Sequence, residues 1–529
     1  MLQLLSQIIE QSANRTPQNV AFRCRERSLT YAELNEQALH LAALLQKSGV
    51  QPGDRVAIYM PKAIEMAVSV YGCLKAGAIY VPIDSTLPAS RLKYVLDDAG
   101  VVAILTLERQ KKQLDEVWSA LECKPRVVVG LLSTGSIDAE VIPWDSVDAR
   151  YKFTPPALSE NDPAYIIYTS GSTGEPKGIL HSHASSLAYA RLAATTYELR
   201  ASDTLGNFAP LHFDQSTFEF FSGPLAGATT VLIPEEHMRF PASLAKLIDD
   251  EQLTIWYSVP FALVQLLLRG ALETRDLSSL RWVLYGGEPF PVGHLRELMK
   301  RLPAATFSNV YGPAEVNQCT YFNLTQPPED SNASIPIGQI WAETTGLIVD
   351  ETDMPVATGD IGELLVNSST TMQGYWNRPE LTARALVQLT HDGNRLQFFR
   401  TGDLVRELED GNLEFHGRSD RQVKIRGNRV ELDEIEAVIL QLPGVLNAAA
   451  FAQPDAATND RRIILAIIPS ANMEFSTDQI QSEARKRLPT YAVPSEVIMT
   501  DNFPQTTSSK TDYIALESQF TVETAGGVV

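Results

Sequence analysis

The chain alternates between helical and strand-like hydrophobic patterns. Residues 31–46 and 63–76 have the hydrophobic periodicity of helices, whereas residues 55–60 and 80–83 are short apolar runs of strand length. Strands that alternate with helices indicate a parallel sheet covered by helices. The same alternation resumes over residues 180–345. The sequence therefore predicts an α/β fold.

Three stretches depart from this alternation. Residues 133–163 are enriched in Ser, Pro, Asp and Glu, which predicts a connecting loop. Residues 361–416 combine short strands with glycine turns, which predicts antiparallel β structure. After Gly417 the chain becomes more charged and has its own helix and strand patterns. We predict a large N-terminal domain of parallel sheets with a β-rich subdomain over residues 1–417, and a small α+β domain over residues 418–529.

The two ends of the chain are short segments of different character. Residues 1–10 lack the basic start and long apolar stretch of a signal peptide, and they are predicted to form an amphipathic helix. Residues 521–529 are predicted to be a frayed tail. No segment reaches the ~18 uninterrupted apolar residues of a membrane span. A membrane is therefore not an expected partner.

Composition narrows the class of protein further. The 529 residues are 44% hydrophobic and 20% charged, which is typical of a globular chain with more than one domain. The formal net charge of −20 argues against a nucleic-acid partner, because neutralising phosphates needs a basic surface. The cysteines form no CxxC pair, so we expect neither zinc nor disulfides but reduced thiols in the cytoplasm. They are Cys24, Cys73, Cys123 and Cys319.

A hydroxyl- and glycine-rich loop follows the apolar run at residues 164–168. It departs from the Walker pattern, because Gly171 is followed five positions later by Pro176. A buried strand that leads into such a loop presents backbone N–H groups and small hydroxyls, which suit the oxygens of a polyphosphate. The alternative is a flexible linker, against which the flanking strand and the Pro-Lys-Gly exit argue. The predicted phosphate-binding residues are Thr169, Ser170, Gly171, Ser172, Thr173, Gly174 and Lys177.

Further motifs occur in a fixed order around this loop. They include Phe-Asp-Gln-Ser at 213–216, Asn-Val-Tyr-Gly-Pro-Ala-Glu at 309–315, Arg-Thr-Gly-Asp-Leu at 400–404 and Gly-Arg-Ser-Asp at 417–420. This series resembles the adenylate-forming enzymes, and most closely the amino-acid adenylation domains of nonribosomal peptide synthetases. Such enzymes make an acyl-adenylate from a carboxylic acid and ATP, release pyrophosphate, and pass the acyl group to a thiol. The resemblance implies an amino-acid ligase that uses ATP and Mg²⁺ and loads a phosphopantetheinylated carrier protein.

Adenylation needs positive charge at the α-phosphate, because two negatively charged reactants must meet there. The resemblance assigns a bridging cation to Lys510 and Mg²⁺ coordination to Glu315. By residue type alone, Lys510 fits a solvated surface lysine and Glu315 fits the cap of a helix that follows Gly-Pro. Ala314 stands where the family commonly has Thr. The chain thereby lacks one hydroxyl donor to the α-phosphate, which is worth about 1 kcal/mol.

A second group of motif residues implies a nucleoside site. By resemblance, Tyr311 stacks on adenine, Asn309 reads its amino group, and Asp403 accepts hydrogen bonds from the ribose hydroxyls. Taken by themselves, Tyr311 and Phe415 fit core aromatics. The whole group of expected nucleotide-binding residues is Gly287, Glu288, Asn309, Tyr311, Asp403, Phe415 and Arg418.

Asp214 decides the expected substrate class. In amino-acid-activating members, an aspartate at this position pairs with the substrate's amino group, which is a strong and orienting contact. The alternative is an aspartate that caps a helix through Ser216 and Thr217. The other pocket positions mix polar and apolar side chains, so we expect a small or medium amino acid and leave proline-like and β-amino acids open. The expected lining is Asp214, Gln215, Phe218, Tyr257, Leu284, Gly286, Val310, Gln318 and Cys319.

The resemblance also assigns a hinge to Asp420, about which the C-terminal domain turns between the two half-reactions. Asp420 beside Arg418 and Arg421 fits a static surface ion pair as well. No Gly-Gly-x-Ser phosphopantetheine site follows Lys510, so the carrier protein is expected in trans.

Two other functions stay open at this point. One is an acyl-CoA or aryl-CoA synthetase of the same fold, against which Asp214 argues. The other is a non-catalytic homologue that acts as a binding partner. The retained Lys510, Glu315 and Asp403 argue against that second reading.

Overall fold

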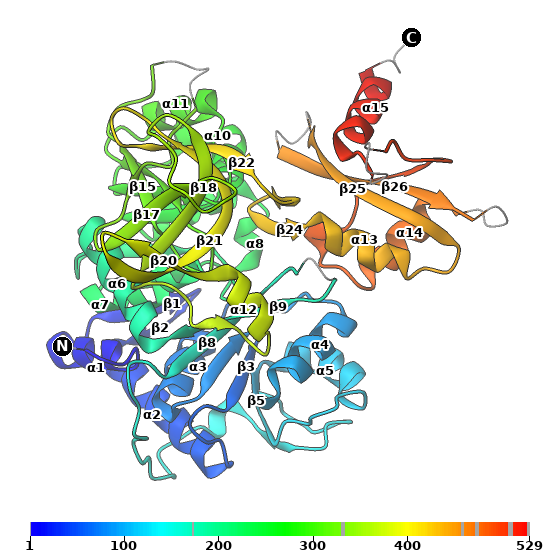
Figure 1. Cartoon of the computed structure of the whole chain (residues 1–529). Coiled ribbons are helices and arrows are strands. Elements are labelled where there is room, and N and C mark those ends of the chain that lie inside the picture. Colours follow the sequence, from blue (N-terminus) through cyan, green and yellow to red (C-terminus); the bar gives the residue numbers. More distant parts are fainter. Residues whose placement is uncertain are drawn as a thin grey trace. The chain divides into compact units, whose positions relative to one another are not determined.

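The computed structural model describes residues 2–171, 174–329, 334–455, 460–470, 475–505 and 511–525. This part of the chain forms two compact units (Figure 1). The first unit comprises Met1–Ser85, Lys93–Tyr168 and Gly178–Ser419. The second comprises Thr86–Leu92, Thr169–Lys177 and Asp420–Val529.

An eight-stranded sheet contains the first strands of the alternating pattern. Its order is β19-β9-β8-β4-β3-β5-β6-β7, and β3 pairs in parallel with both β4 and β5. β19 is antiparallel to β9. The strands are β3 (Arg55–Tyr59), β4 (Ile79–Pro82), β5 (Val101–Thr106), β6 (Val127–Val129), β7 (Glu140–Ile142), β8 (Pro163–Thr169), β9 (Lys177–Ser182) and β19 (Gly374–Tyr375).

A nine-stranded sheet holds the middle of the chain. Its order is β16-β15-β14-β13-β12-β10-β11-β1-β2, with a parallel centre from β14 to β1 and antiparallel edges. The strands are β1 (Val20–Cys24), β2 (Arg27–Thr30), β10 (Thr204–Asn207), β11 (Thr229–Leu232), β12 (Ile255–Ser258), β13 (Trp282–Gly286), β14 (Thr306–Tyr311), β15 (Thr320–Leu324) and β16 (Gln339–Ile340).

Along the sequence, helices separate many strands of both sheets, as the alternating pattern predicts. In residues 1–419 they are α1 (Gln7–Arg15), α2 (Tyr31–Lys47), α3 (Ile64–Ala76), α4 (Ala89–Ala99), α5 (Lys111–Trp118), α6 (His183–Thr196), α7 (Gly223–Ala226), α8 (Glu235–Met238), α9 (Pro241–Asp250), α10 (Pro260–Arg269), α11 (Val292–Arg301) and α12 (Pro379–Ala385).

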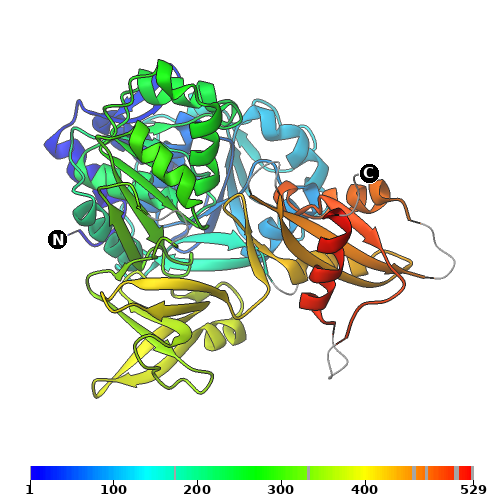
Figure 2. The ribbon, with the colours of Figure 1, turned by 90° about the horizontal axis from the view of Figure 1, so that it is seen from above.

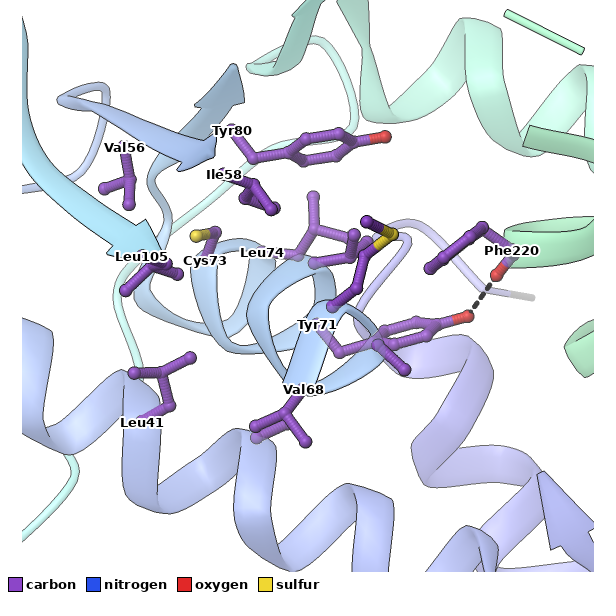
Figure 3. Packing of buried hydrophobic residues seen from close by; sticks show 14 of the residues in the cluster. Leu41, Val56, Ile58, Val68, Tyr71, Cys73, Leu74, Tyr80, Leu105 and Phe220 are labelled. Atoms are coloured by element: carbon purple, nitrogen blue, oxygen red, sulfur yellow. Dashed lines mark hydrogen bonds between the residues drawn. The ribbon is translucent and has the colours of Figure 1, made fainter. Parts of the chain in front are cut away.

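Helix α3 occupies the centre of the main hydrophobic core. All of its residues except Glu65 are buried, as expected of a helix that is apolar on every side. Gly72 lets α2 approach closely, because a Cβ at this position would lie 2.6 Å from Cδ2 of Leu41. Figure 3 shows this packing, in which the Tyr71 hydroxyl donates to the carbonyl oxygen of Phe220. The core therefore ties α3 to the segment that follows β10.

A smaller antiparallel sheet completes the first unit. Strand β21 pairs with β18, β20 and β22, and β18 also pairs with β17. The prediction of antiparallel structure over residues 361–416 is confirmed. The strands are β17 (Thr344–Val349), β18 (Ile361–Ser368), β20 (Leu386–His391), β21 (Asn394–Glu407) and β22 (Leu413–Arg418).

The second unit contains a three-stranded sheet with helices on both faces. Alternate residues of β25 face opposite ways: Ala450 packs with Ile435 and Ile480 of α13 and α14, whereas Phe451 packs with Phe520 of α15. Figure 2 shows α15, in red, beside this sheet. The elements are β23 (Gln422–Ile425), β24 (Asn428–Glu431), α13 (Leu432–Leu440), β25 (Val445–Asp455), β26 (Asp460–Pro469), α14 (Thr477–Arg485), β27 (Glu496–Met499) and α15 (Tyr513–Ala525).

Most predicted elements are confirmed, and three are corrected. Residues 133–163 are not wholly a loop, because they contain β7 and the short helix η2 (Trp144–Ser146). The N-terminal helix α1 begins at Gln7 and runs beyond residue 10. Residues 521–525 continue α15, so the tail is not frayed there, and residues 526–529 lie outside the described ranges. Among the described residues, no helix is long and apolar enough to cross a membrane.

Candidate active site

Four parallel strands of the nine-stranded sheet end side by side. β10, β12, β13 and β14 are consecutive neighbours, and their carboxyl ends lie at one edge. The chain leaves β10 for β11 on one side and returns to β12 on the other, so this edge holds a topological switch point. Open α/β sheets bind ligands in the crevice at such a point. The edge is therefore the place to look for the predicted site residues.

The structure gathers four of the expected substrate residues into one hydrophobic cluster. Tyr257, Leu284 and Val310 come from β12, β13 and β14, and Phe218 comes from the π-helical turn η3 (Phe218–Ser222). Tyr257 is in register with Leu284, and its ring lies 5.7 Å from the Phe218 ring at 90°. These residues are far apart in the sequence, and the parallel pairing of the strands brings them together.

Gly286 is the last residue of β13, and the close approach of two backbones explains why a glycine stands there. A Cβ at Gly286 would lie 2.1 Å from the carbonyl oxygen of Val310 on the paired strand. The close approach of β13 and β14 therefore requires glycine here.

Asp214 lies half-buried on the turn that follows β10. Its carbonyl oxygen accepts hydrogen bonds from the backbone N–H and the hydroxyl of Thr217, at 2.9 and 2.6 Å. Burial, followed by the nearby charge of Asp214, raises the pKa of the Tyr257 hydroxyl well above its usual value. The Asp214 carboxylate thus acts on the cluster at the strand ends.

Two of the expected substrate residues lie beside this cluster, on the segment between β14 and β15. Gln318 is buried, and its Nε2 donates a 2.7 Å hydrogen bond to the hydroxyl of Tyr197. Cys319 lies in the neighbouring cluster with Val316, and its backbone N–H donates to the carbonyl oxygen of Tyr311 at 2.9 Å. Burial raises the pKa of the Cys319 thiol, so this thiol stays protonated.

Glu315 is completely buried in a turn rather than at the start of a helix, so its alternative capping role is wrong. The Tyr375 hydroxyl donates a 2.7 Å hydrogen bond to Glu315 Oε1. The neighbouring carbonyl oxygen of Ala314 lies 2.9 Å from Nε2 of His181. Burial lowers the pKa of His181 to about 4, so at neutral pH the ring is uncharged and its Nε2–H can donate to that oxygen.

His181 and Tyr375 are residues that the sequence reasoning missed. Both act on the Glu315 turn from positions more than 50 residues away, and the sequence assigned neither of them a role there. For His181 the sequence signal is its place four positions after Lys177, on the strand that leaves the predicted phosphate loop, and for Tyr375 it is the ordered motif Gly-Tyr-Trp-Asn-Arg-Pro-Glu at 374–380.

The structure brings three of the expected nucleoside residues into contact. The Tyr311 hydroxyl donates to Oδ2 of Asp403, and Arg418 donates to Oδ1 of the same carboxylate. Tyr311 ends β14, whereas Asp403 and Arg418 are paired across β21 and β22. On β14, Val310 faces the substrate cluster while Tyr311 packs with the neighbouring one. One strand therefore contributes to both halves of the expected site.

The other expected nucleoside residues differ in exposure and contacts. Nδ2 of Asn309 donates to the carbonyl oxygen of Pro336 at 2.8 Å. Glu288 Oε1 accepts from the backbone N–H of Phe261 at 2.8 Å, and Gly287 has a left-handed φ of 91°. Phe415 is 36% exposed on β22, so its reading as a core aromatic is wrong.

The predicted phosphate loop belongs to the second unit. Thr169 ends β8 with a buried hydroxyl, and Lys177 begins β9. At Gly171 a Cβ would lie 2.2 Å from the carbonyl oxygen of Glu175, so the loop turns back on itself there. Ser170 and Gly174 lie between these points. Ser172, Thr173 and Lys510 lie outside the described residues.

The last crossing of the chain from the first unit to the second falls between Ser419 and Asp420. Arg418, in the first unit, pairs with Asp403. Arg421, in the second unit, pairs with Asp433 and Glu436. The two arginines that flank Asp420 are thus each held by carboxylates of their own unit.

Glu315 is the acidic residue for which a metal role is expected. Among the described residues, no group of three or more His, Cys, Asp or Glu side chains is arranged to hold a metal ion. Mg²⁺ is commonly held by one or two carboxylates together with substrate phosphates and water. A single buried carboxylate at the edge of the sheet fits that mode and not a cage made of protein ligands.

A half-buried acid, a buried acid and a cluster of aromatic side chains lie near a switch point, where open α/β sheets bind small ligands. Two family models match the chain: that of AMP-binding enzymes over residues 9–376 and that of the AMP-binding enzyme C-terminal domain over residues 434–510. The chain belongs to the AMP-binding enzyme family. The expected fold and the adenylate-forming class are confirmed, and membership implies the use of ATP.

Individual relatives are similar along nearly the whole chain. It is 34% identical over 516 residues to tyrocidine synthase 3 from Brevibacillus parabrevis, covering 97% of this chain but 8% of that protein. It is 31% identical over 525 residues to an L-proline–[L-prolyl-carrier protein] ligase from Pseudomonas fluorescens, covering 98% of this chain and 99% of that one. The Vibrio cholerae adenylation domain AlmE, solved with glycyl-adenosine-5'-phosphate, superposes with a TM-score of 0.82 at 26% identity, covering 99% and 98% of the two chains.

Proposed function

We propose that the protein activates an amino acid as aminoacyl-AMP, with release of pyrophosphate, and then transfers it to the phosphopantetheine thiol of a separate carrier protein. The observation that carries this proposal is the position of the half-buried Asp214, on the turn that follows β10 at the switch point. A carboxylate there pairs with the ammonium of an amino acid and sets its orientation. The similarity to a carrier-protein ligase and to an adenylation domain supports the same activity.

The substrate side chain occupies the cluster on one face of β14, and the nucleoside occupies the other. Tyr311 stacks on adenine, and the amide oxygen of Asn309 accepts from its amino group, since Nδ2 is bonded to Pro336. Asp403 accepts from the ribose hydroxyls, because a carboxylate has more acceptor sites than the bonds from Tyr311 and Arg418 use. Gly287, Glu288 and Phe415 complete this side of the site.

The phosphates of ATP require positive charge and small donors. The loop from Thr169 to Lys177 binds the β- and γ-phosphates, and Glu315 holds Mg²⁺ together with phosphate oxygens. When bound, the ion neutralises charge that develops on the phosphates. Lys510 supplies the cation between the substrate carboxylate and the α-phosphate.

The two parts of the chain have different tasks in this proposal. Residues up to Ser419 bind ATP and the amino acid, and the residues from Asp420 onward form a mobile domain that carries Lys510. Asp420 is the hinge, and its neighbours Arg418 and Arg421 are each paired with carboxylates of their own unit. Free cysteine thiols are typical of a reducing compartment, so the proposed site of the reaction is the cytoplasm.

Exchange of labelled pyrophosphate into ATP tests the proposal. A panel of amino acids, aryl acids and fatty acids is offered to the full chain, and we expect exchange only with amino acids. Exchange only with aryl or fatty acids would indicate a CoA synthetase of the same fold. Exchange with none of them would contradict the proposal and favour a binding role. The second half-reaction is checked by transfer of label to a phosphopantetheinylated carrier protein.

A further inference from the structure

The side chain of Gln318 contains a buried acceptor that nothing in the described part of the protein satisfies. Gln318 is 2% exposed, and its Nε2 donates to the Tyr197 hydroxyl at 2.7 Å and to the carbonyl oxygen of Thr320 at 3.4 Å. Its Oε1 is buried and has no hydrogen-bond partner among the described residues. The two bonds from Nε2 fix the amide plane and so fix the direction in which Oε1 points.

The side chain of Gln318 borders the cluster at the strand ends through its hydrogen bond to Tyr197. The ring of Tyr197 is 5.9 Å from that of Phe218, and both belong to the same cluster as Tyr257, Leu284 and Val310. Ser308 is fully buried two residues before Val310 on β14, and alternation puts both on one face of the strand. The cluster itself is therefore apolar, and the polar side chains of Ser308 and Gln318 lie beside it.

A buried hydrogen-bond donor lies on the turn that carries Asp214. Nε2 of Gln215, next to Asp214, is buried and has no hydrogen-bond partner among the described residues. The Thr217 hydroxyl donates to Oδ1 of Asn317 at 3.3 Å, which joins the Asp214 turn to the segment that carries Gln318. One unsatisfied donor and one unsatisfied acceptor thus lie on two adjoining segments.

Folded proteins leave few buried polar atoms without partners, because each such atom has lost its hydrogen bonds to water. A ligand that supplies the missing partners removes that penalty. The buried atoms at this site that lack partners among the described residues, in Gln215, Gln318 and Ser308, are uncharged amide and hydroxyl atoms, and a charged ligand group placed there would remain unneutralised. The group that fits is therefore polar and uncharged.

We propose that the substrate is an amino acid with an uncharged polar side chain, a carboxamide or a hydroxyl, that donates to Gln318 Oε1 and accepts from Gln215 Nε2. This inference rests on the proposed function and specifies its substrate class. Tyr197 is a positioning residue in this arrangement, since it holds the Gln318 amide without touching the substrate. A site built in this way rejects an apolar analogue far more strongly than an apolar pocket rejects a polar one.

The test measures pyrophosphate exchange with pairs of amino acids of similar size. The pairs are threonine and valine, asparagine and leucine, and glutamine and methionine, with proline added alone. We expect the best polar substrate to exceed its apolar partner and proline by about 100-fold or more in kcat/KM. A preference for proline or for the apolar members would overturn the inference and leave the proposed function intact. Exchange with no amino acid would overturn both.

Variants of Gln318 and Tyr197 test whether these side chains cause the preference for a polar substrate. Gln318→Leu should lower kcat/KM for the polar substrate by about 100-fold and leave its apolar partner unchanged or improved. Tyr197→Phe should lower the polar-to-apolar ratio by about 10-fold, because it releases the Gln318 amide. Gln318→Met, which keeps the length of the side chain, serves if the leucine variant does not fold. Gln110→Leu is the matched control, since Gln110 is buried but donates to the carbonyl oxygen of Ser85, which follows β4 of the eight-stranded sheet. An unchanged ratio in Gln318→Leu and Gln318→Met would refute the role of Gln318.

Discussion

The hydroxyl of Tyr375 donates a 2.7 Å hydrogen bond to the buried carboxylate of Glu315. Tyr375 belongs to β19 at the edge of the eight-stranded sheet, whereas Glu315 follows β14 of the nine-stranded sheet. The carboxylate is thus oriented by a residue from a different sheet. In the proposed reaction, this bond aims the ligand of Mg²⁺ at the phosphates.

Tyr375→Phe should therefore weaken the response to Mg²⁺ without disturbing the fold. A hydrogen bond to a charged group contributes about 1.5–3 kcal/mol, so we expect a loss of about 10- to 100-fold in exchange rate at limiting Mg²⁺. The measurement is the exchange rate as a function of Mg²⁺ concentration. Tyr71→Phe, which removes a comparable buried bond in the core, should leave the Mg²⁺ dependence unchanged. An equal loss at all Mg²⁺ concentrations would show that Tyr375 does not act through the metal.

Asp403→Asn should raise the KM for ATP by at least about 10-fold and leave the KM for the amino acid within about threefold. The physical reason is that the substitution removes a charge-assisted acceptor for the ribose and the counter-charge of Arg418. Steady-state exchange with each substrate varied in turn gives both values.

The chain contains a matched control for that variant. Asp203 forms a similar pair with Arg281, just before β10 and β13 begin, and therefore at the other edge of the sheet. Asp203→Asn should lower the free energy of unfolding without changing the KM for ATP. Equal changes in KM in both variants would mean that Asp403 has a structural role only.

Asp420→Pro should separate the two half-reactions. Proline fixes φ and resists the rotation that a hinge needs. We expect pyrophosphate exchange within about threefold of the unaltered protein and transfer to the carrier protein reduced by at least about 100-fold. Asp420→Ala, which keeps backbone freedom, should retain both activities. If the proline variant lost both half-reactions equally, Asp420 would not be the hinge.

Acid should destabilise the first unit through His183. Burial lowers the pKa of His183 from 6.5 to about 4, and its Nδ1 accepts from the backbone N–H of Leu5 at 3.2 Å. Since the folded pKa is the lower one, the stability is fully present above pH 6.5 and is lost as the pH falls towards 4. At pH 5 the loss is about 2 kcal/mol in the free energy of unfolding.

Urea unfolding at pH 7.5 and at pH 5.0 measures this loss. His183→Asn should show a difference between the two pH values that is smaller by about 2 kcal/mol. His391→Asn, at a partly exposed position, should keep the difference of the unaltered protein. The same pH difference in His183→Asn as in the unaltered protein would contradict the role of His183.

The sequence predicts what depends on local pattern. The strand before the phosphate loop, α2, α3 and the antiparallel strands after residue 361 follow from hydrophobic period and turn residues. Strand β7 was missed because three residues give too short a pattern, and its pairing with β6 decides its conformation.

The residues of the candidate site also fall into two groups: those that sequence motifs mark, and those whose role depends on contacts with distant residues. Asp214, Glu315 and Asp403 stand in ordered motifs and could be named from the sequence. His181, Tyr197 and Tyr375 could not, because each acts through a hydrogen bond to a residue at least 60 positions away. Gln318 was named as a lining residue, but only the structure shows that its Oε1 is buried without a partner among the described residues.

The central claim is that Asp214 binds the amino group of the substrate. The most direct test compares kcat/KM in pyrophosphate exchange for the preferred amino acid and for the same acid without its amino group, in the unaltered protein and in Asp214→Ala. We predict that removal of the amino group costs about 1,000-fold or more in the unaltered protein and almost nothing in the variant, since the partner is then absent. The same ratio in both proteins would contradict the claim.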